Sequence, residues 1–256
     1  AAVTTPTFHD ALVDVSFTGV VEQAATFEQE LQGFPLASDA ESSANTQFAV
    51  VSSGRATDAP GDPEEFVSTN VGGPSIPNYS PDNFDANNVA TLSFDFVVPD
   101  DAEGIAFDWK FGTEENPEFL DSAFQDFFEA ILITPDGTFG NIGVLPDESP
   151  VTVDNANDYS NSPGGTSQDP TPPLPEPPDV VYNAVTDQQT AVTDVAAYQG
   201  QTLRLRIRVA DATDGVYDSA VFLDRLRFLG DVDIDLSVTP VVEAMDRYQE
   251  TVNDAI

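Results

Sequence analysis

Alternation of apolar and polar residues is the main pattern along this chain. Such alternation over about four to eight residues is typical of a β-strand that turns one face to the core. It predicts strands over residues 10–21, 48–52, 91–98, 105–111, 128–134, 202–209 and 220–229. Short strands separated by turn residues, with few helical windows, predict an all-β fold, which we expect to be an antiparallel β-sandwich or jelly-roll-like domain.

Large apolar residues on two of the predicted strands define a candidate core. Side chains two positions apart on a strand point to the same face. These residues are Leu92, Phe94 and Phe96 on one strand, and Ile105, Phe107, Trp109 and Phe111 on the next. We interpret the aromatic residues among them as core residues and not as the wall of a catalytic cleft.

The chain divides into three expected parts. Residues 1–9 form an N-terminal arm, residues 10–230 the β-sandwich domain, and residues 231–256 a C-terminal helical tail. Within the domain, residues 160–179 are rich in Pro, Gly and Ser, which predicts an extended loop or insertion.

The tail carries the signals of a short helix. Thr239 suits an N-cap and Pro240 the first helical position. Apolar residues then recur at helical spacing, at Val241, Met245, Tyr248 and Val252. This amphipathic helix either packs onto the sandwich or acts as a connector to another subunit.

Acidic residues dominate the composition. The 256 residues include 45 Asp and Glu against 8 Lys and Arg, for a formal net charge of −37. Highly charged chains of low hydrophobicity stay unfolded, but 40% of these residues are hydrophobic and 18 are Phe, which is enough for a core. Because high salt screens the repulsion and the charge maintains solubility, the composition indicates an extremely halophilic, archaeal type of protein. A calcium-loaded extracellular module is a compatible interpretation.

The same charge excludes several partners. Nucleic acids and anionic membrane surfaces bind clusters of Lys and Arg, so we expect no nucleic-acid partner. No stretch is long and apolar enough to span a bilayer, so we expect no direct membrane insertion. The sequence opens at Ala1-Ala2-Val3 without an initiator Met, as a processed, secreted protein does.

His and Cys, which often serve in catalysis and metal binding, are scarce. The chain has no Cys, and His9 is its single His. A catalytic triad or a zinc site needs more of these residues. We therefore predict no catalytic residues of this kind and expect a protein that is not an enzyme.

Arginines form two rows on predicted strands. Arg204, Arg206 and Arg208 alternate with apolar residues, and Arg225 and Arg227 repeat the pattern on a strand that we expect to lie beside the first. They either pair with carboxylates of adjacent strands or receive an acidic patch of a neighbouring subunit. These five arginines are the candidate interface residues.

Three motifs carry a resemblance to a known family. Residues 111–128 (FGTEENPEFLDSAFQDFF), 151–157 (VTVDNAN) and 210–224 (ADATDGVYDSAVFLD) resemble, in the same order, the signature segments of the choice-of-anchor L domain. The match covers about residues 10–230, with Asn116 where an aromatic residue is usual and Gln125 where Asn is usual. The resemblance implies a secreted, extracellular surface protein without catalytic activity, whose anchoring device varies between members.

Oxygen-bearing residues within these motifs are the candidate metal ligands. Ca²⁺ takes about six to eight oxygen ligands, often from loops between strands. The candidates for a possible Ca²⁺ site are Glu114, Glu115, Asp126, Asn155, Asp211, Asp214 and Asp218. The alternative is that these carboxylates are solvated or paired with arginines.

Two non-enzymatic functions remain open, together with a remote third. In the first, the chain is a structural subunit of an extracellular filament, pilus-like fibre or coat, and binds copies of itself or other surface proteins. Residues 1–21 then either add a strand to a neighbour's sheet or pair within their own domain. Alternatively, it is a monomeric adhesive module that binds glycan or another surface ligand through its loops. The remote alternative is a glycoside hydrolase with Glu114 or Glu115 and Asp126 as its carboxyl pair.

Overall fold

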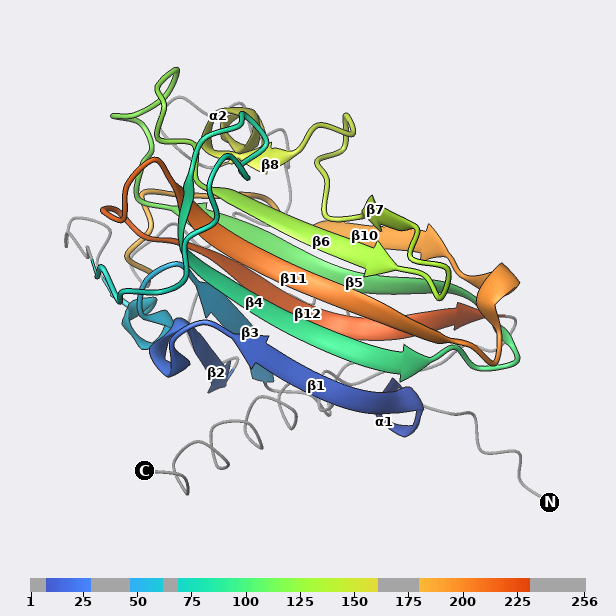
Figure 1. Ribbon diagram of the computed structural model, residues 1–256. Helices are drawn as coiled ribbons and strands as arrows, with labels where there is room; N and C mark the ends of the chain where they lie inside the picture. The colour runs from blue at the N-terminus through green and yellow to red at the C-terminus, as the bar shows by residue number, and fades with distance from the viewer. Residues whose placement is uncertain (1–7, 29–46, 62–68, 161–179, 231–256) are drawn as a thin grey trace.

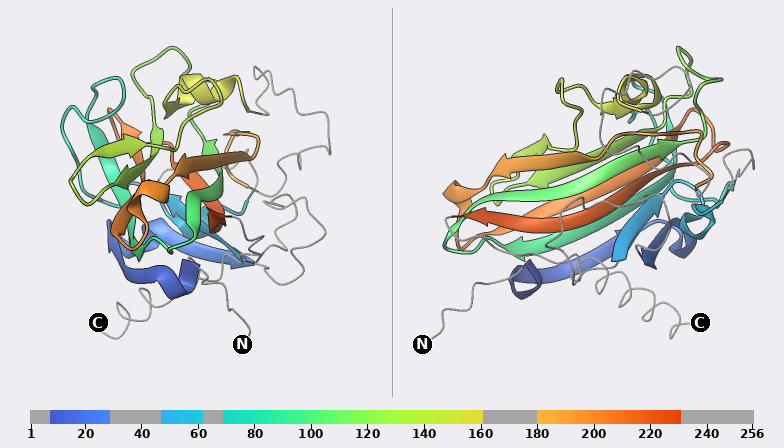
Figure 2. Two further views of the ribbon diagram at one scale, coloured as in Figure 1. Left: turned by 90° about the vertical axis from the view of Figure 1, so that its right-hand side faces the viewer. Right: turned by 180° about the vertical axis from the view of Figure 1, so that it is seen from behind.

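The computed structural model describes residues 8–28, 47–61, 69–160 and 180–230. Two antiparallel sheets of six strands each pack face to face, which confirms the predicted all-β sandwich (Figure 1). Figure 2 shows the two layers from the end and from behind. The alternating sequence produces this architecture because each sheet has one apolar face that must be covered by another.

The first sheet, which we call sheet A, lies in front in Figure 1. Its strand order is β1-β4-β11-β6-β7, and β8 also pairs with β6. The strands are β1 (Leu12–Thr18), β4 (Ala86–Val97), β6 (Phe127–Ile133), β7 (Phe139–Asn141), β8 (Val151–Thr152) and β11 (Thr202–Ala212).

The second sheet, sheet B, lies behind it with the order β10-β5-β12-β3-β2, and β9 pairs with β5. The strands are β2 (Ala24–Glu28), β3 (Gln47–Ser52), β5 (Ala102–Thr113), β9 (Ala184–Val185), β10 (Gln189–Asp194) and β12 (Ser219–Gly230). The helical turns are short: α1 (Phe8–Ala11), α2 (Val153–Asn157), η1 (Val21–Gln23), η2 (Ala56–Asp58) and η3 (Ala196–Tyr198).

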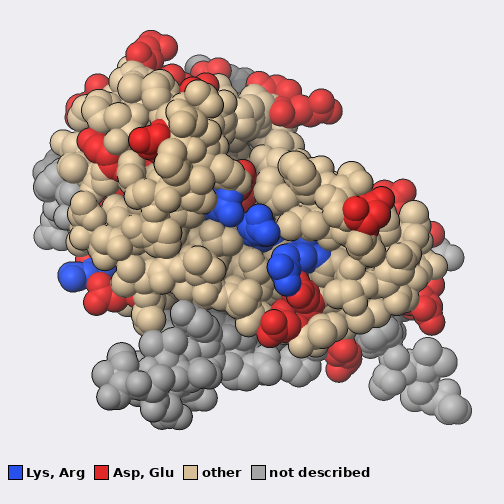
Figure 3. Space-filling view, viewed as in Figure 1, with Lys and Arg blue, Asp and Glu red and all other residues tan. Residues whose placement is uncertain are grey.

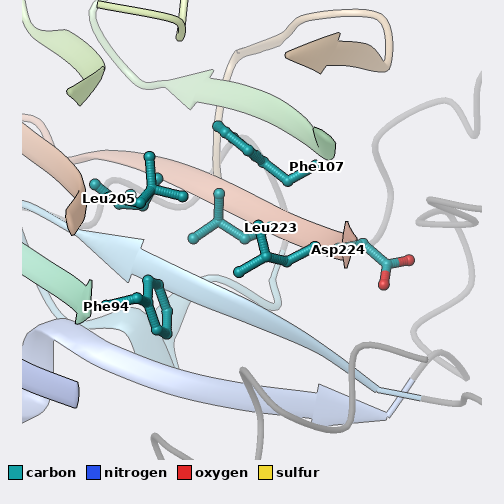
Figure 4. Close-up of a pocket in the computed structure, with 7 residues that line it drawn as sticks. Phe94, Phe107, Leu205, Leu223 and Asp224 are labelled. Carbon is teal, nitrogen blue, oxygen red and sulfur yellow. The ribbon is translucent and has the colours of Figure 1, made fainter. Parts of the chain in front are cut away.

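The predicted core residues of β4 and β5 all lie between the sheets. Each of the seven is at most 2% exposed, which confirms the assignment made from alternation. Trp109 packs on Phe128 with ring centroids 5.0 Å apart. A small void of about 10 Å³ remains near Phe94, Phe107 and Leu205 (Figure 4). It is almost entirely apolar and too small for an organic ligand, so we expect it to stay dry.

Sheet B is covered on its outer face as well. Phe48, Val50 and Phe222 point away from sheet A and form a second apolar cluster with Val181 and Tyr182. A strand that is buried on both faces loses the simple alternation of apolar and polar residues. Sheet A therefore presents the more polar outer face.

The N-terminal segment folds into its own domain. Phe8 is 1% exposed and stacks on Phe228 at a centroid distance of 5.5 Å. β1 then pairs antiparallel with β4 at the edge of sheet A. The alternative that this segment pairs within its own domain therefore holds for residues 12–18, which form an edge strand with one neighbour among the described residues. Residues 1–7 lie outside the described part.

Two further predictions fall on residues that the structure does not describe. The predicted helix of the tail lies in residues 231–256, and most of the predicted insertion lies in residues 161–179. Within the described ranges, none of the helices has the length and apolar character that crossing a membrane requires.

Candidate functional site

Acidic side chains from segments that are distant in the sequence meet at one end of the sandwich, on the left in Figure 1. β3, β5 and β11 end there, and β4, β6 and β12 begin there. Six of the seven candidate metal ligands lie at these strand ends: Glu114, Glu115, Asp126, Asp211, Asp214 and Asp218. The remaining candidate, Asn155, is on α2, where its side-chain amide donates to the Pro150 carbonyl oxygen at 3.0 Å.

Asp126 lies at the centre of this acidic group and links the two sheets. Its Oδ1 accepts a hydrogen bond from the Ala212 amide at 2.9 Å, and its Oδ2 accepts one from the Ser219 hydroxyl at 2.7 Å. Ala212 ends β11 of sheet A, and Ser219 begins β12 of sheet B. The carboxylate therefore holds the loop between these strands against both sheets.

The neighbouring carboxylates are held by short contacts. Asp211 Oδ2 accepts a hydrogen bond from the Asn88 side-chain amide at 2.9 Å. Asp218 Oδ2 accepts one from the Thr69 hydroxyl at 2.6 Å. The Asp218 carboxylate lies so close to Gly54 that a Cβ there would be 1.8 Å from Oδ2, so only glycine fits.

Burial and mutual repulsion act on this group together. Burial raises the pKa of Glu115, Asp126 and Asp211 well above the usual range of a carboxyl group. The charge of Asp126 raises the pKa of both Glu115 and Asp211 further. Burial also raises the pKa of Asp218 to about 6. The folded protein therefore resists ionising all of these groups without a compensating charge.

Two oxygen atoms in the group have no hydrogen-bond partner. They are Glu115 Oε2 and Asp211 Oδ1, on residues that are 1% and 0% exposed. A buried polar atom without a partner costs about 1–3 kcal/mol, so it calls for a ligand, a proton or a water. Among the described residues, no three acidic side chains already surround one point as the ligands of a bound ion do.

A polar cavity of about 360 Å³ opens beside the acidic group. Asn88, which bonds Asp211, and Asp214 both line it. The complete lining is Asn70, Gly72, Gly73, Ser75, Asn87, Asn88, Thr213, Asp214 and Gly215. The cavity therefore collects two segments, around residues 70–88 and 213–215, that are far apart in the sequence.

Hydrogen bonds within the lining fix its side chains. Asn70 Oδ1 accepts from the Gly72 amide at 3.0 Å, and Asn88 Oδ1 accepts from the Gly73 amide at 3.1 Å. Asn87 Oδ1 accepts from the Ser75 hydroxyl at 2.9 Å. The side-chain NH₂ groups of Asn70 and Asn87 make no hydrogen bond with the described residues.

Most of the cavity residues were not among the sequence-based candidates. Asn70, Ser75, Asn87, Asn88 and Thr213 lie outside the residues singled out for metal binding, and of that set Asp214 alone lines the cavity. The adjacent amides Asn87 and Asn88 and the pair Gly72 and Gly73 were the available signal. Alternation gives no reason to connect them with the loop at residues 213–215.

The candidate interface arginines are largely paired within the chain. Arg204 bonds Asp95 at 2.5 Å and Arg208 bonds Glu129 at 2.8 Å, both across sheet A. Figure 3 shows basic side chains in a short line over this face. Arg206 makes no ion pair with a described residue. The alternative of pairing with adjacent strands therefore accounts for Arg204 and Arg208.

Arg225 and Arg227 lie elsewhere. β11 and β12 belong to opposite sheets, so the expectation that the two arginine rows are neighbours is wrong. The chain crosses from one sheet to the other between these strands because each apolar face must cover the other sheet. On sheet B, Arg225 and Arg227 both bond the buried carboxylate of Asp108.

The carboxyl group of Asp224, beside Asp108, predicts a pH dependence of stability. Burial raises the pKa of Asp224 to about 7, the charge of Asp108 adds to the rise, and Arg225 and Arg227 oppose it. Because the folded pKa is raised, its stabilising contribution is complete below about pH 4 and is lost as pH rises to about 7. We expect Asp224→Asn to increase the free energy of unfolding at pH 8 by about 1–3 kcal/mol. The substitution should also reduce the fall in the free energy of unfolding between about pH 4 and pH 7.

Urea unfolding of both proteins at pH 5 and pH 8 in constant salt measures the effect. If the free energy of unfolding changes by the same amount between pH 5 and pH 8 in wild type and in Asp224→Asn, Asp224 is not the group responsible for the pH dependence.

The chain matches one family profile and is similar to several solved structures. A family profile described as the choice-of-anchor L domain matches residues 9–228. No curated protein matches the sequence at a significant level. Among solved structures, the chain is similar to TmCBM61 in complex with beta-1,4-galactotriose, with a TM-score of 0.38 and 7% identity over 86% of this chain and 91% of that chain.

Two other solved structures have comparable similarity. One is a carbohydrate-binding module specific for non-crystalline cellulose, CBM28, with a TM-score of 0.37 and 13% identity over 84% of this chain and 87% of that chain. The other belongs to carbohydrate-binding modules of the β-sandwich superfamily with promiscuous specificity. Its TM-score is 0.31, with 8% identity over 84% of this chain and 56% of that chain. Similarities this weak carry no argument about ligand or function.

Proposed function

Because this chain belongs to the choice-of-anchor L domain family, we propose that it is a non-catalytic cell-surface domain that binds a neutral saccharide in the polar cavity. The observation that carries this proposal is the lining of the cavity: amides, hydroxyls and one carboxylate, with glycines that leave space between them. The proposal replaces a filament subunit as the function that we favour.

The polarity of the lining selects the class of ligand. Pockets for most small molecules are predominantly apolar, with a few polar groups that fix orientation. This cavity has the opposite character, since Asn70 and Asn87 contribute amide groups and Asp214 a carboxylate, while no aromatic residue lines it. A ligand covered with hydroxyl groups exchanges its bonds to water for bonds to these side chains, whereas an apolar ligand gains little.

The charge of the site favours a neutral ligand. Asp214 lines the cavity, and Asp211 lies next to it through Asn88. With a formal net charge of −37, the whole molecule repels anions, and this repulsion persists at short range even where salt screens it at long range. Uronic-acid and sulfated saccharides are therefore unfavourable, and neutral ones are favoured.

The size of the cavity limits the length of saccharide that it holds. A volume of about 360 Å³ is near the lower end of the range of about 300–1,000 Å³ that is typical of ligand pockets. This size suits the end of a saccharide or a short side branch.

A glycosidase is less well supported. Such enzymes need two carboxyl groups facing the scissile bond across a cleft, at about 5–9.5 Å from each other. Asp214 is the single carboxylate that lines the cavity, and Glu114, Glu115 and Asp126 are no more than 3% exposed. The carboxyl pair considered from the sequence therefore has no described route to a substrate.

A structural subunit of a surface assembly is less well supported. The strand expected to join a neighbour's sheet is paired with β4, and four of the five candidate interface arginines bond carboxylates of the same chain. The binding module needs neither feature, so we favour it.

Loss of a free amide in the cavity is expected to weaken saccharide binding. Asn70→Ala and Asn87→Ala each remove one side-chain NH₂ group and should each lower affinity by about 5- to 30-fold, as expected for a hydrogen bond worth about 1–2 kcal/mol. Gln201→Ala is the matched control, since it removes an exposed amide at the opposite end of β11.

The measurement is a screen of neutral and uronate oligosaccharides by calorimetry in molar salt, followed by the variants. Binding of a neutral saccharide that both asparagine variants weaken and Gln201→Ala preserves supports the proposal. Failure of all neutral saccharides to bind, or equal affinity in all three variants, contradicts it.

A further inference from the structure

Three carboxylates beside the cavity lie in a place where charge is costly. Glu115 follows β5, Asp126 precedes β6 and Asp211 lies in β11, and none of the three is more than 1% exposed. Hydrogen bonds bring the three segments together: Asp126 accepts one from the amide of Ala212, the residue after Asp211. It also accepts one from the Ser219 hydroxyl, which lies 2.9 Å from the hydroxyl of Thr113, two residues before Glu115. Burial of several like charges is unfavourable unless an opposite charge is present.

Within the described ranges, no basic side chain supplies that charge. None of the seven basic residues there forms an ion pair with Glu115, Asp126 or Asp211, and the arginines of both sheets are engaged elsewhere or lie on an outer face. Hydrogen bonds compensate only in part. They reach Asp126 twice and one oxygen of Asp211, whereas the Glu115 carboxylate has no hydrogen bond with a described residue.

The two unpartnered oxygens distinguish this group from an ordinary acidic surface. Glu115 Oε2 and Asp211 Oδ1 are both buried and make no hydrogen bond with a described residue. A protonated carboxyl group would still need an acceptor for its proton, and an ionised one needs donors or a cation. A cation delivered into the interior would meet the requirement of both atoms at once.

We propose that Glu115, Asp126 and Asp211 bind a hard divalent cation, Ca²⁺, at the end of the sandwich beside the polar cavity. The donors are all oxygen atoms, which excludes the ligand sets typical of Zn²⁺ and Cu²⁺. Ca²⁺ accepts six to eight oxygen ligands in irregular geometry and can complete its shell with water, whereas Mg²⁺ requires a stricter octahedron.

Binding requires a local rearrangement of side chains. The carboxylates do not yet stand around one point, and Glu115 is the residue best able to move because no hydrogen bond holds its carboxylate. The ion would then join the end of β5 in sheet B to β6 and β11 in sheet A. It would also fix Asn88, and with it one wall of the cavity, through Asp211.

Calcium titration of the metal-free protein tests the proposal. In chelator-treated protein at pH 8 and constant molar salt, calorimetry should detect saturable binding of Ca²⁺. Thermal unfolding should shift upward by about 5–10 °C when Ca²⁺ is about 100 times its dissociation constant. EDTA should reverse the shift.

Replacing these carboxylates by amides should affect calcium binding and the stability of the metal-free protein in opposite directions. Glu115→Gln and Asp211→Asn should abolish saturable binding and the calcium-induced shift, yet raise the unfolding temperature of the metal-free protein because a repelling charge is gone. Asp224→Asn is the matched control, since it neutralises a buried carboxylate on the outer face of sheet B and should keep the full calcium response. If Asp211→Asn fails to fold, Glu115→Gln alone decides.

Absence of saturable binding at millimolar Ca²⁺, with an unchanged unfolding temperature, overturns the proposal. Binding that survives in Glu115→Gln and Asp211→Asn also overturns it, because the ion then sits on the acidic surface. Saccharide titrations in EDTA are a separate measurement, so loss of the cation site and loss of the proposed saccharide site are distinguishable.

Discussion

Gln23→Ala is expected to destabilise the protein by about 3–5 kcal/mol, because the Gln23 side chain clamps three backbone groups in a fully buried position. Its Nε2 donates to the Ser53 carbonyl at 2.8 Å and to the Asn88 carbonyl at 2.5 Å, and its Oε1 accepts from the Val20 amide at 2.7 Å. Ser53 follows β3 of sheet B and Asn88 belongs to β4 of sheet A, so this single side chain joins the two sheets.

The alanine leaves these groups without partners in the interior and creates a cavity as well. Urea unfolding at constant molar salt measures the loss. Gln23→Met separates the two causes, since it keeps most of the volume but none of the hydrogen bonds and should retain most of the destabilisation. A change below about 1 kcal/mol in Gln23→Ala is the outcome that would show the clamp to be unimportant.

Asp108→Ala is expected to destabilise the protein by about 3–5 kcal/mol, the usual cost of removing one member of a buried ion pair. The Asp108 side chain is 0% exposed and bonds both Arg225 and Arg227. It also accepts hydrogen bonds from Thr190 at 2.9 Å and from Gln188 at 3.2 Å. The substitution leaves the two partly buried guanidinium groups of β12 without their carboxylate partner on β5.

Salt separates this buried pair from the exposed ones. Molar salt screens exposed charges strongly and buried ones much less. The effect of Asp108→Ala should therefore persist between low and molar salt, wherever the protein is folded. Arg204→Ala is the control: its pair with Asp95 is 46% exposed on the arginine side, so the loss should be about 1 kcal/mol or less and should fall in high salt. Equal salt dependence of the two variants contradicts the assignment of Asp108 as a buried anchor.

The saccharide and cation proposals share one end of the molecule but rest on different atoms. The saccharide proposal depends on the free amides of Asn70 and Asn87, which face the cavity. The cation proposal depends on the unpartnered oxygens of Glu115 and Asp211, which are buried. Asn88 is the physical link, because it lines the cavity and bonds Asp211.

The sequence by itself determined the main strands and the residues that fill the space between them. Leu92, Phe94, Phe107 and Trp109 were identified as core because side-chain direction along a strand alternates strictly, whatever the strand pairs with. The motifs at residues 111–128 and 210–224 were sufficient to place the chain in its family. They also contain most of the acidic residues that meet at the end of the sandwich.

Only the tertiary structure decided which strands are neighbours and which polar groups are buried. Alternation could not reveal that β11 and β12 lie in opposite sheets, or that Arg225 and Arg227 meet Asp108 of β5. The cavity was equally hidden, because it joins Asn70 and Asn87 to Asp214 across more than a hundred residues. The physical reason is that periodicity is a local property of the chain, whereas strand pairing and burial follow from long-range packing of whole apolar faces.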